Sequence, residues 1–169
     1  TPGVDDLQGS KDIKLCGASR LKVGVNFARQ LGASHAILTS RADPTQEDPS
    51  YLLDLVRLCR EYLPLVDMHT NGFLVLPGKP KEYLLSHLVD RGLTMITFSI
   101  ASFNSEMNRN LMIIKDSAAH LIKSARDLGL MVRCSLVVSK EGVNDFRGVM
   151  EYIKDAGELG AHMVVIREV

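Results

Sequence analysis

One local pattern, repeated five times, constrains the fold of this chain more than any other feature of its sequence. Each repeat contains an amphipathic helix, a glycine or proline break, an apolar strand and a group of polar residues. The predicted strands are 35–39, 65–69, 94–100, 131–138 and 162–166. They begin roughly every 30 to 37 residues, which is the length of one strand-and-helix unit in a parallel sheet.

The helices between these strands are predicted from apolar residues at helical spacing. We expect them at 21–31, 49–63, 81–90, 121–128 and 144–153. Asp48 followed by Pro49 is typical of a helix start, and Asn144 is expected to cap the last helix. Glycines stand where four of the predicted helices end, namely Gly32, Gly92, Gly129 and Gly160.

Repeated strand-and-helix units predict an α/β fold with a parallel sheet and right-handed crossovers. The nearly continuous apolar strands indicate a sheet covered by helices on at least one face, with the other face closed by barrel curvature or by more helices. An incomplete barrel is the favoured interpretation, and a doubly wound open sheet is the alternative. We expect a single domain over residues 1–169, in which residues 1–17 form a loop or a poorly ordered segment.

The composition excludes several classes of partner. Lys plus Arg equals Asp plus Glu at 20 each, so the chain has no strong nucleic-acid signal. The apolar runs are strand-sized and far shorter than the roughly 20 residues of a membrane span, so we expect no membrane insertion. Cys16, Cys59 and Cys134 are odd in number and widely spaced, which argues against disulfides and favours a cytoplasmic protein.

Polar residues follow each predicted strand, and in parallel α/β folds the ligand lies beyond the carboxyl ends of the strands. Three of these polar groups form short motifs. Ser40-Arg41-Ala42-Asp43-Pro44-Thr45 follows the first predicted strand, Thr70-Asn71-Gly72 the second, and Ser99-Ile100-Ala101-Ser102 the third. Arg133, Ser135 and Ser139 lie on or after the fourth.

In this order, the motifs resemble those of the radical S-adenosylmethionine (radical SAM) superfamily. The first resembles the family's G-G-E-P-T stretch but lacks both glycines, the second matches T-N-G, and the third resembles S-I-D-S with Ala101 at the acid. The resemblance implies a partial (β/α)6 TIM-like barrel. It also implies S-adenosylmethionine and a 4Fe-4S cluster as cofactors, and an external electron donor. Reductive cleavage would then give a 5'-deoxyadenosyl radical that acts on an unidentified substrate.

The resemblance also implies which residues bind the cofactor. They are Ser40, Arg41, Ala42, Asp43, Thr70, Asn71, Ser99, Ser102, Arg133 and Ser135. The family's C-x-x-x-C-x-x-C cluster loop and the strand before it are not found in this sequence, where Cys16 alone stands as a candidate metal ligand. Truncation, a disordered loop or a cluster-free barrel that serves as a binding or scaffold module would each explain this difference.

Several candidate residues have a structural interpretation beside the functional one. Arg133 and Cys134 must point to opposite faces of their strand, and a buried Arg133 would need an anionic partner such as a ligand carboxylate. His69 is a proton shuttle or a structural histidine. Ser102 binds ribose or caps a helical turn. An unrelated phosphate- or aldehyde-handling barrel would need a glycine-rich phosphate loop near the late strands, and none is convincing here.

Overall fold

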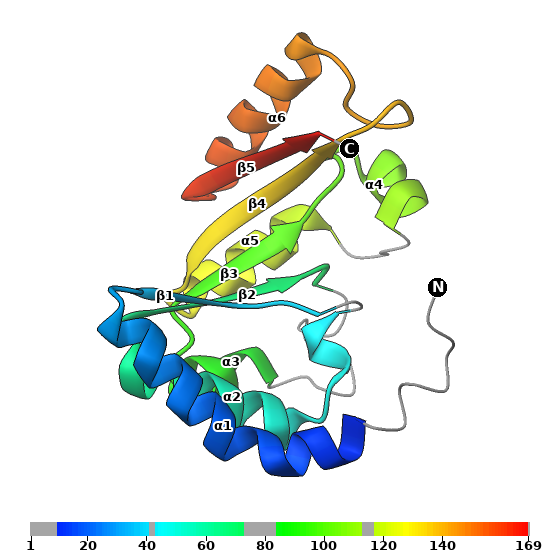
Figure 1. The fold of residues 1–169 in the computed structure, drawn as a ribbon. Helices are drawn as coiled ribbons and strands as arrows, with labels where there is room; N and C mark the ends of the chain where they lie inside the picture. Colours follow the sequence, from blue (N-terminus) through cyan, green and yellow to red (C-terminus); the bar gives the residue numbers. More distant parts are fainter. Residues whose placement is uncertain (1–9, 41–42, 73–83, 113–116, 169) are drawn as a thin grey trace.

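The computed structural model describes the backbone of residues 10–18 and the complete residues 19–40, 43–72, 84–112 and 117–168 (Figure 1). The strands are β1 (His35–Leu38), β2 (Leu65–Thr70), β3 (Met95–Ser99), β4 (Met131–Val138) and β5 (Met163–Glu168). The helices are α1 (Ser10–Gln30), the 3-10 turn η2 (Pro44–Gln46), α2 (Pro49–Tyr62), α3 (Leu84–Asp90), α4 (Ser105–Met112), α5 (Ala118–Asp127) and α6 (Phe146–Glu158).

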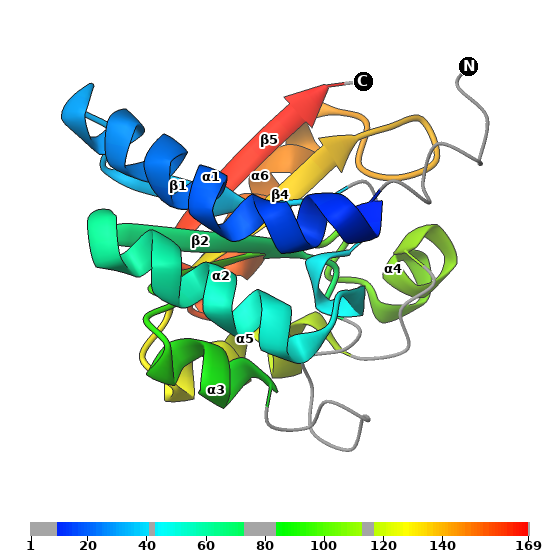
Figure 2. The same ribbon diagram turned by 60° about the horizontal axis from the view of Figure 1, so that its bottom comes forward.

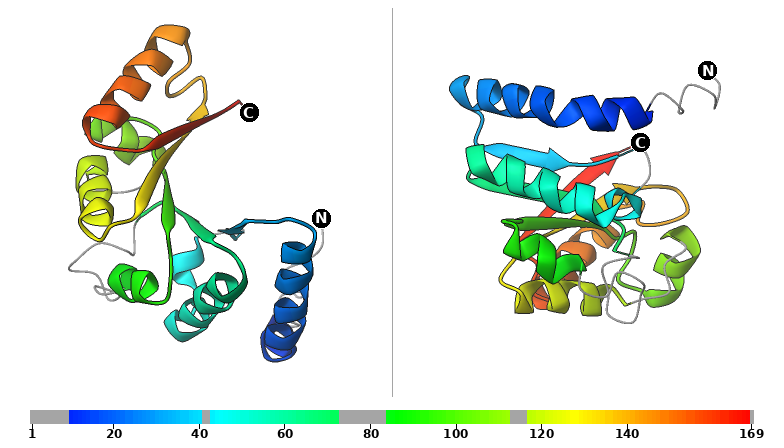
Figure 3. Two further views of the ribbon diagram at one scale, coloured as in Figure 1. Left: turned by 90° about the vertical axis from the view of Figure 1, so that its left-hand side faces the viewer. Right: turned by 90° about the horizontal axis from the view of Figure 1, so that it is seen from below.

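The five strands form one parallel sheet in the order β1-β2-β3-β4-β5. A right-handed crossover from each strand to its next neighbour places every crossover helix on the same face. Figure 3 shows the result: the sheet curls, and α2, α3, α5 and α6 follow its outer side, while no helix of the described residues covers the inner side. Since the strand order never reverses, the structure confirms the incomplete barrel and excludes the doubly wound alternative.

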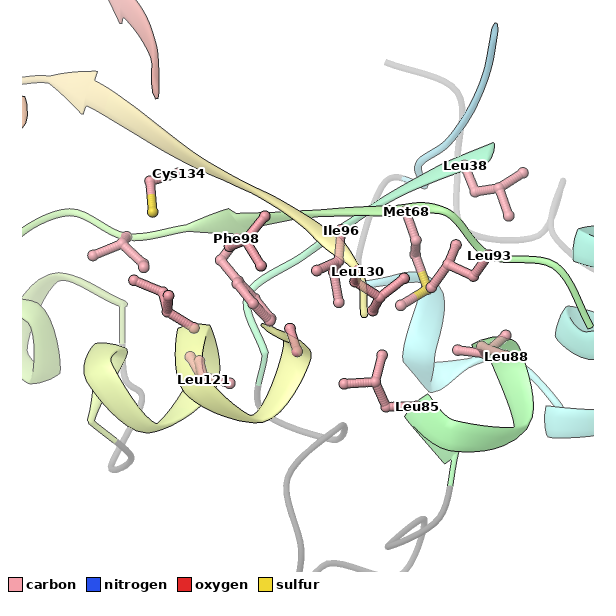
Figure 4. Close-up of a cluster of buried hydrophobic side chains, with 14 of the residues drawn as sticks. Leu38, Met68, Leu85, Leu88, Leu93, Ile96, Phe98, Leu121, Leu130 and Cys134 are labelled. Carbon is pink, nitrogen blue, oxygen red and sulfur yellow. The ribbon is translucent and has the colours of Figure 1, made fainter. Parts of the chain in front are cut away.

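The core lies between the sheet and the outer helices (Figure 4). Alternate strand residues point into it, and Val66, Met68, Ile96 and Phe98 are fully buried there. Helix α1 packs against α2, and Figure 2 shows the two helices side by side. In the part of the chain that is described, no helix is long and apolar enough to span a bilayer.

Local sequence explains most of the helix ends. The Asp48 carboxylate accepts hydrogen bonds from the backbone N–H groups of Ser50 and Tyr51, which confirms the predicted start of α2. The four predicted glycine stops all adopt left-handed backbone angles, with φ of 94° at Gly32, 104° at Gly92, 81° at Gly129 and 92° at Gly160. Each ends a helix just before a strand, as expected of a glycine at this position.

Three local predictions differ from the structure. Helix α1 begins at Ser10, so residues 10–17 are helical rather than a loop, because Lys11, Lys14 and Leu15 are good helix formers. Helix α6 is capped by Asp145 rather than Asn144, since the Asp145 carboxylate accepts from Gly148 N–H. Helix α4 was not predicted, because it is short and polar and begins at a side-chain cap from Asn104.

Gly72 and Gly129 give a matched test of the packing around the T-N-G motif. Both have positive φ, but a Cβ at Gly72 would lie 2.5 Å from Leu121 Cδ2, whereas one at Gly129 meets nothing within 4 Å. We expect Gly129→Ala to lower the free energy of unfolding by about 1–2 kcal/mol through backbone strain alone. Gly72→Ala should cost about 1–3 kcal/mol more because Leu121 is buried and must repack.

Urea denaturation of both variants measures this difference. Equal destabilisation of the two variants would contradict the close packing of β2's end against α5.

Candidate functional site

The inner face of the sheet carries polar side chains at its centre. Residues that alternate with the core positions point to this face, and the strand register groups them in layers. From the amino towards the carboxyl ends, the layers are Ile37, Asp67 and Met95; then His69, Thr97 and Arg133; then Ser99 and Ser135. The inner face therefore carries hydroxyl groups near the carboxyl ends of the strands and an ion pair farther towards their amino ends.

Asp67 is the centre of this surface, and its side chain has no exposed area. Its Oδ2 atom accepts from Arg133 Nη1 at 3.1 Å and lies 3.1 Å from His69 Nε2. The Thr97 hydroxyl donates to the same carboxylate at 3.0 Å. Burial of a carboxylate is costly unless charge and hydrogen bonds compensate, and here three side chains from three strands supply them.

His35 faces the same carboxylate from β1. Its Nε2 atom lies 3.8 Å from Asp67 Oδ2, which is too long for a hydrogen bond. This atom is enclosed and, among the residues that the structure describes, has no hydrogen-bond partner. Four strands thus direct polar groups to one point on the inner face.

A second carboxylate, that of Asp43, connects the ends of β1 and β2. Its Oδ1 accepts from the backbone N–H and the hydroxyl of Thr45, at 2.9 and 2.6 Å. Its Oδ2 accepts from the Thr70 hydroxyl and the Asn71 backbone N–H, both at 2.7 Å. The structure therefore joins Asp43, Thr70 and Asn71, three of the residues predicted to bind cofactor, and occupies both oxygens of Asp43 with contacts inside the chain.

The side chain of Thr70 lies on the same face of β2 as those of Val66 and Met68 and so points towards the helices rather than the inner face. Its oxygen also accepts from Gly72 N–H at 2.9 Å, which fixes the turn after β2. The side chains of Thr70 and Asp43 are thus both engaged in shaping the loop, and the cofactor-binding role of these two residues stays a prediction. Of the first motif, Ser40 is exposed, while Arg41 and Ala42 lie outside the described residues.

Two other predicted residues, Ser99 and Ser135, are neighbours in register on β3 and β4. Within the described parts of the chain, neither hydroxyl has a recorded partner. Ser102 is buried, and its hydroxyl accepts from Asn104 N–H, which favours the structural interpretation as a turn cap. A cavity of about 290 Å³ opens beside this turn and is lined by residues that include Phe103, Asp145 and Tyr152.

The cysteines are placed as packing residues where the structure describes them. Cys59 and Cys134 are buried, and burial raises the pKa of both thiols, that of Cys134 to about 12. Cys16 belongs to α1, and its side chain lies outside the described residues. Among those residues, no group of three His, Cys, Asp or Glu side chains could hold a metal ion.

The sequence singled out Arg133 but missed Asp67. The structure confirms that Arg133 and Cys134 point to opposite faces. It places Arg133 on the inner face and Cys134 in the core, and it supplies the anionic partner within the chain. A single acid inside the apolar strand 65–70 was the available clue, because a buried acid on one strand and a buried arginine on another must find each other.

Solved structures share this fold. SuiB from Streptococcus suis, also solved with bound S-adenosylmethionine, superposes with a TM-score of 0.69 at 17% identity, over 89% of this chain and 33% of its own. The coproporphyrinogen III oxidase HemN from Escherichia coli, described as a radical SAM enzyme, gives a TM-score of 0.60 at 16% identity over 95% of this chain and 38% of its own. This chain has the fold of a radical SAM domain.

Methylornithine synthase PylB extends the likeness, with a TM-score of 0.60 at 18% identity over 81% of this chain and 39% of its own. The half-barrel described here thus matches 33% to 39% of the length of these three proteins. No protein-family model matches the chain, and no curated protein is significantly similar in sequence.

A double-mutant cycle on Asp67 and Arg133 tests the central ion pair. Asp67→Ala should lower the free energy of unfolding by about 3–5 kcal/mol, because it leaves the Arg133 guanidinium largely buried without its partner. Adding Arg133→Met should recover about 1–3 kcal/mol of the sum of the two single losses. The exposed Arg147–Glu151 pair on α6 is the control, with an expected coupling below about 0.5 kcal/mol. Equal coupling in the two pairs would refute the arrangement.

The pKa of Cys134 gives a prediction with a defined sign. Burial raises it to about 12, and burial also raises the pKa of Tyr152, with a smaller contribution from Cys134. The folded state then keeps protons that the unfolded state loses, so stability falls as the pH rises above about 9. Cys134→Val should make this decline less steep, by at most about 1.4 kcal/mol per pH unit. Urea titrations from pH 8 to 10 check it, and identical slopes for variant and wild type would disprove it.

Proposed function

We propose that this chain is the barrel domain of a radical SAM enzyme and binds S-adenosylmethionine at the carboxyl ends of β1 to β4. The fold shared with SuiB and HemN supports the family. The observation that carries the site is the Ser99–Ser135 pair, because two neighbouring hydroxyls on the inner face have no partner among the described residues.

The donor set at this edge fits the cofactor. S-adenosylmethionine carries an amine, a carboxylate and ribose hydroxyls, which need acceptors and donors at separate points. Ser99, Ser135 and the exposed Ser40 offer hydroxyl groups there, and the Asp43 carboxylate holds the loops in place around them. In this proposal Asn71 and Ser102 shape the edge beside the cofactor.

The cluster needs a different source of ligands. A 4Fe-4S cluster of this family takes three thiolates, and the described residues hold no such set. In this proposal the cluster ligands come from groups outside the described residues, among them the side chain of Cys16. When bound, the two cofactors would supply a reactive radical through an external electron donor. The free thiols favour the reducing cytoplasm for such a protein.

Calorimetry with the full-length protein that contains this chain tests the proposed site. We expect saturable S-adenosylmethionine binding, and Ser99→Ala or Ser135→Ala should each weaken it about threefold to tenfold, the effect of one lost hydrogen bond. Ser34→Ala is the matched control, because Ser34 lies at the amino end of β1, away from the carboxyl ends where the cofactor is proposed to bind.

Three results are decisive. Weakening by the two inner-face variants with an unchanged control supports the site. Equal affinity of all three variants for S-adenosylmethionine would mean that Ser99 and Ser135 are not part of the binding site. A full-length protein that does not bind S-adenosylmethionine favours the cluster-free binding or scaffold module instead.

A further inference from the structure

The guanidinium of Arg133 uses a small part of its hydrogen-bonding capacity. An arginine side chain has five N–H donors in a planar fork. Within the described residues, the contact that the structure records is a single end-on bond from Nη1 to Asp67 Oδ2. The Arg133 side chain is 15% exposed, and no partner for its other donors is recorded among the described residues. A bound anion would satisfy these donors with charge-assisted hydrogen bonds.

Neighbouring groups make this position suitable for a ligand. The enclosed His35 Nε2 atom is also without a partner among the residues described, and it faces the same carboxylate as Arg133. Ile37 lies on the inner face beside Asp67 and is 51% exposed, and Met163 is in register with Arg133 on its other side. The concavity thus combines a charged anchor with apolar walls, which is the usual composition of a small-molecule site.

We infer that Arg133 binds a carboxylate group of the substrate on the inner face of the barrel, with Asp67 as the residue that positions its guanidinium. This assignment rests on the proposed radical SAM function and names the chemical class of its substrate: a carboxylic acid whose aliphatic part packs beside Arg133, against Met163. A carboxylate matches the planar fork of arginine with two parallel hydrogen bonds.

The charges at the site favour a carboxylate over a phosphate. Asp67 places one negative charge 3.1 Å from the guanidinium, so the ion pair has no net charge. A dianionic phosphate would bring two negative charges beside the Asp67 carboxylate, where the other basic groups among the described residues are the imidazoles of His35 and His69. A singly charged carboxylate needs only the donors that Arg133 still offers.

Arg133 lies farther from the carboxyl ends of the strands than the proposed cofactor site does. Arg133 precedes the last residue of β4, Val138, by five positions, a distance of about 17 Å along a strand. The Ser99–Ser135 layer lies between Arg133 and the carboxyl edge. The family resemblance assigned Arg133 to the cofactor, and its depth assigns it instead to the molecule that lies below the cofactor.

Nuclear magnetic resonance of the full-length protein, labelled with ¹⁵N-arginine, tests the inference with butyrate as the probe. Butyrate has one carboxylate and a short aliphatic chain, and butyramide is its neutral counterpart. We expect butyrate to shift the Arg133 Nε–H resonance saturably, and neither butyramide nor inorganic phosphate to do so. The resonance is assigned by its loss in Arg133→Lys.

A second arm separates substrate from cofactor. Calorimetry on Arg133→Met should show S-adenosylmethionine affinity within twofold of wild type, while the variant gives at least a tenfold weaker response of its inner-face methyl resonances to butyrate. Arg147→Met, which removes an exposed arginine on α6, should change neither quantity. The wild-type titration depends only on the assignment by Arg133→Lys, so it stands even where Arg133→Met fails to fold.

Each outcome decides the inference. A saturable, charge-dependent shift at Arg133 with unchanged cofactor affinity supports it. No shift with butyrate, or an equal shift with butyramide, overturns it. A tenfold loss of S-adenosylmethionine affinity in a folded Arg133→Met also overturns it and returns Arg133 to the cofactor. Failure of the wild type to bind S-adenosylmethionine while butyrate still binds refutes the proposed function alone.

Discussion

The right-handed crossover is the constraint on which the rest of this structure depends. It places the crossover helices on one face of a sheet whose strands follow each other in chain order, so the opposite face curls without a helix to cover it. Apolar side chains fill the covered face, as Phe98 and Met68 do. The uncovered face can therefore hold polar residues, and Asp67 is the one most dependent on its surroundings, since its buried charge needs Arg133, Thr97 and His69.

The carboxylates of Asp43 and Asp67 have different roles in the barrel. Asp43 ties the loop after β1 to the end of β2 through backbone and hydroxyl donors, which fixes the edge where the cofactor is proposed to bind. Asp67 lies deeper and orients an arginine and a histidine in the concavity. Asp43 thus shapes the carboxyl-end loops, and Asp67 shapes the interior of the barrel with side chains from separate strands.

The parts of the fold that follow from local chemistry could be predicted from the sequence. Five strands, the glycine helix stops and the Asp48 cap depend on neighbouring residues, and the sequence indicates each of them. Helix α4 could not be found from its apolar pattern, because a side-chain cap defines it. The roles of Asp43 and Thr70 in fixing the loop could not be predicted from the sequence either, since their hydrogen bond joins residues 27 positions apart. The same holds for Asp67 and Arg133, which are 66 positions apart.

Anaerobic reconstitution of the full-length protein with iron and sulfide tests the central claim most directly, by optical and electron paramagnetic resonance spectroscopy. A radical SAM enzyme built on this barrel should gain absorption near 400 nm, the region where iron-sulfur clusters absorb. Addition of S-adenosylmethionine to the reduced sample should then change the resonance spectrum of the cluster, because the cofactor binds beside it. A full-length protein that takes up no cluster, or whose cluster spectrum does not change when S-adenosylmethionine is added, would contradict the account.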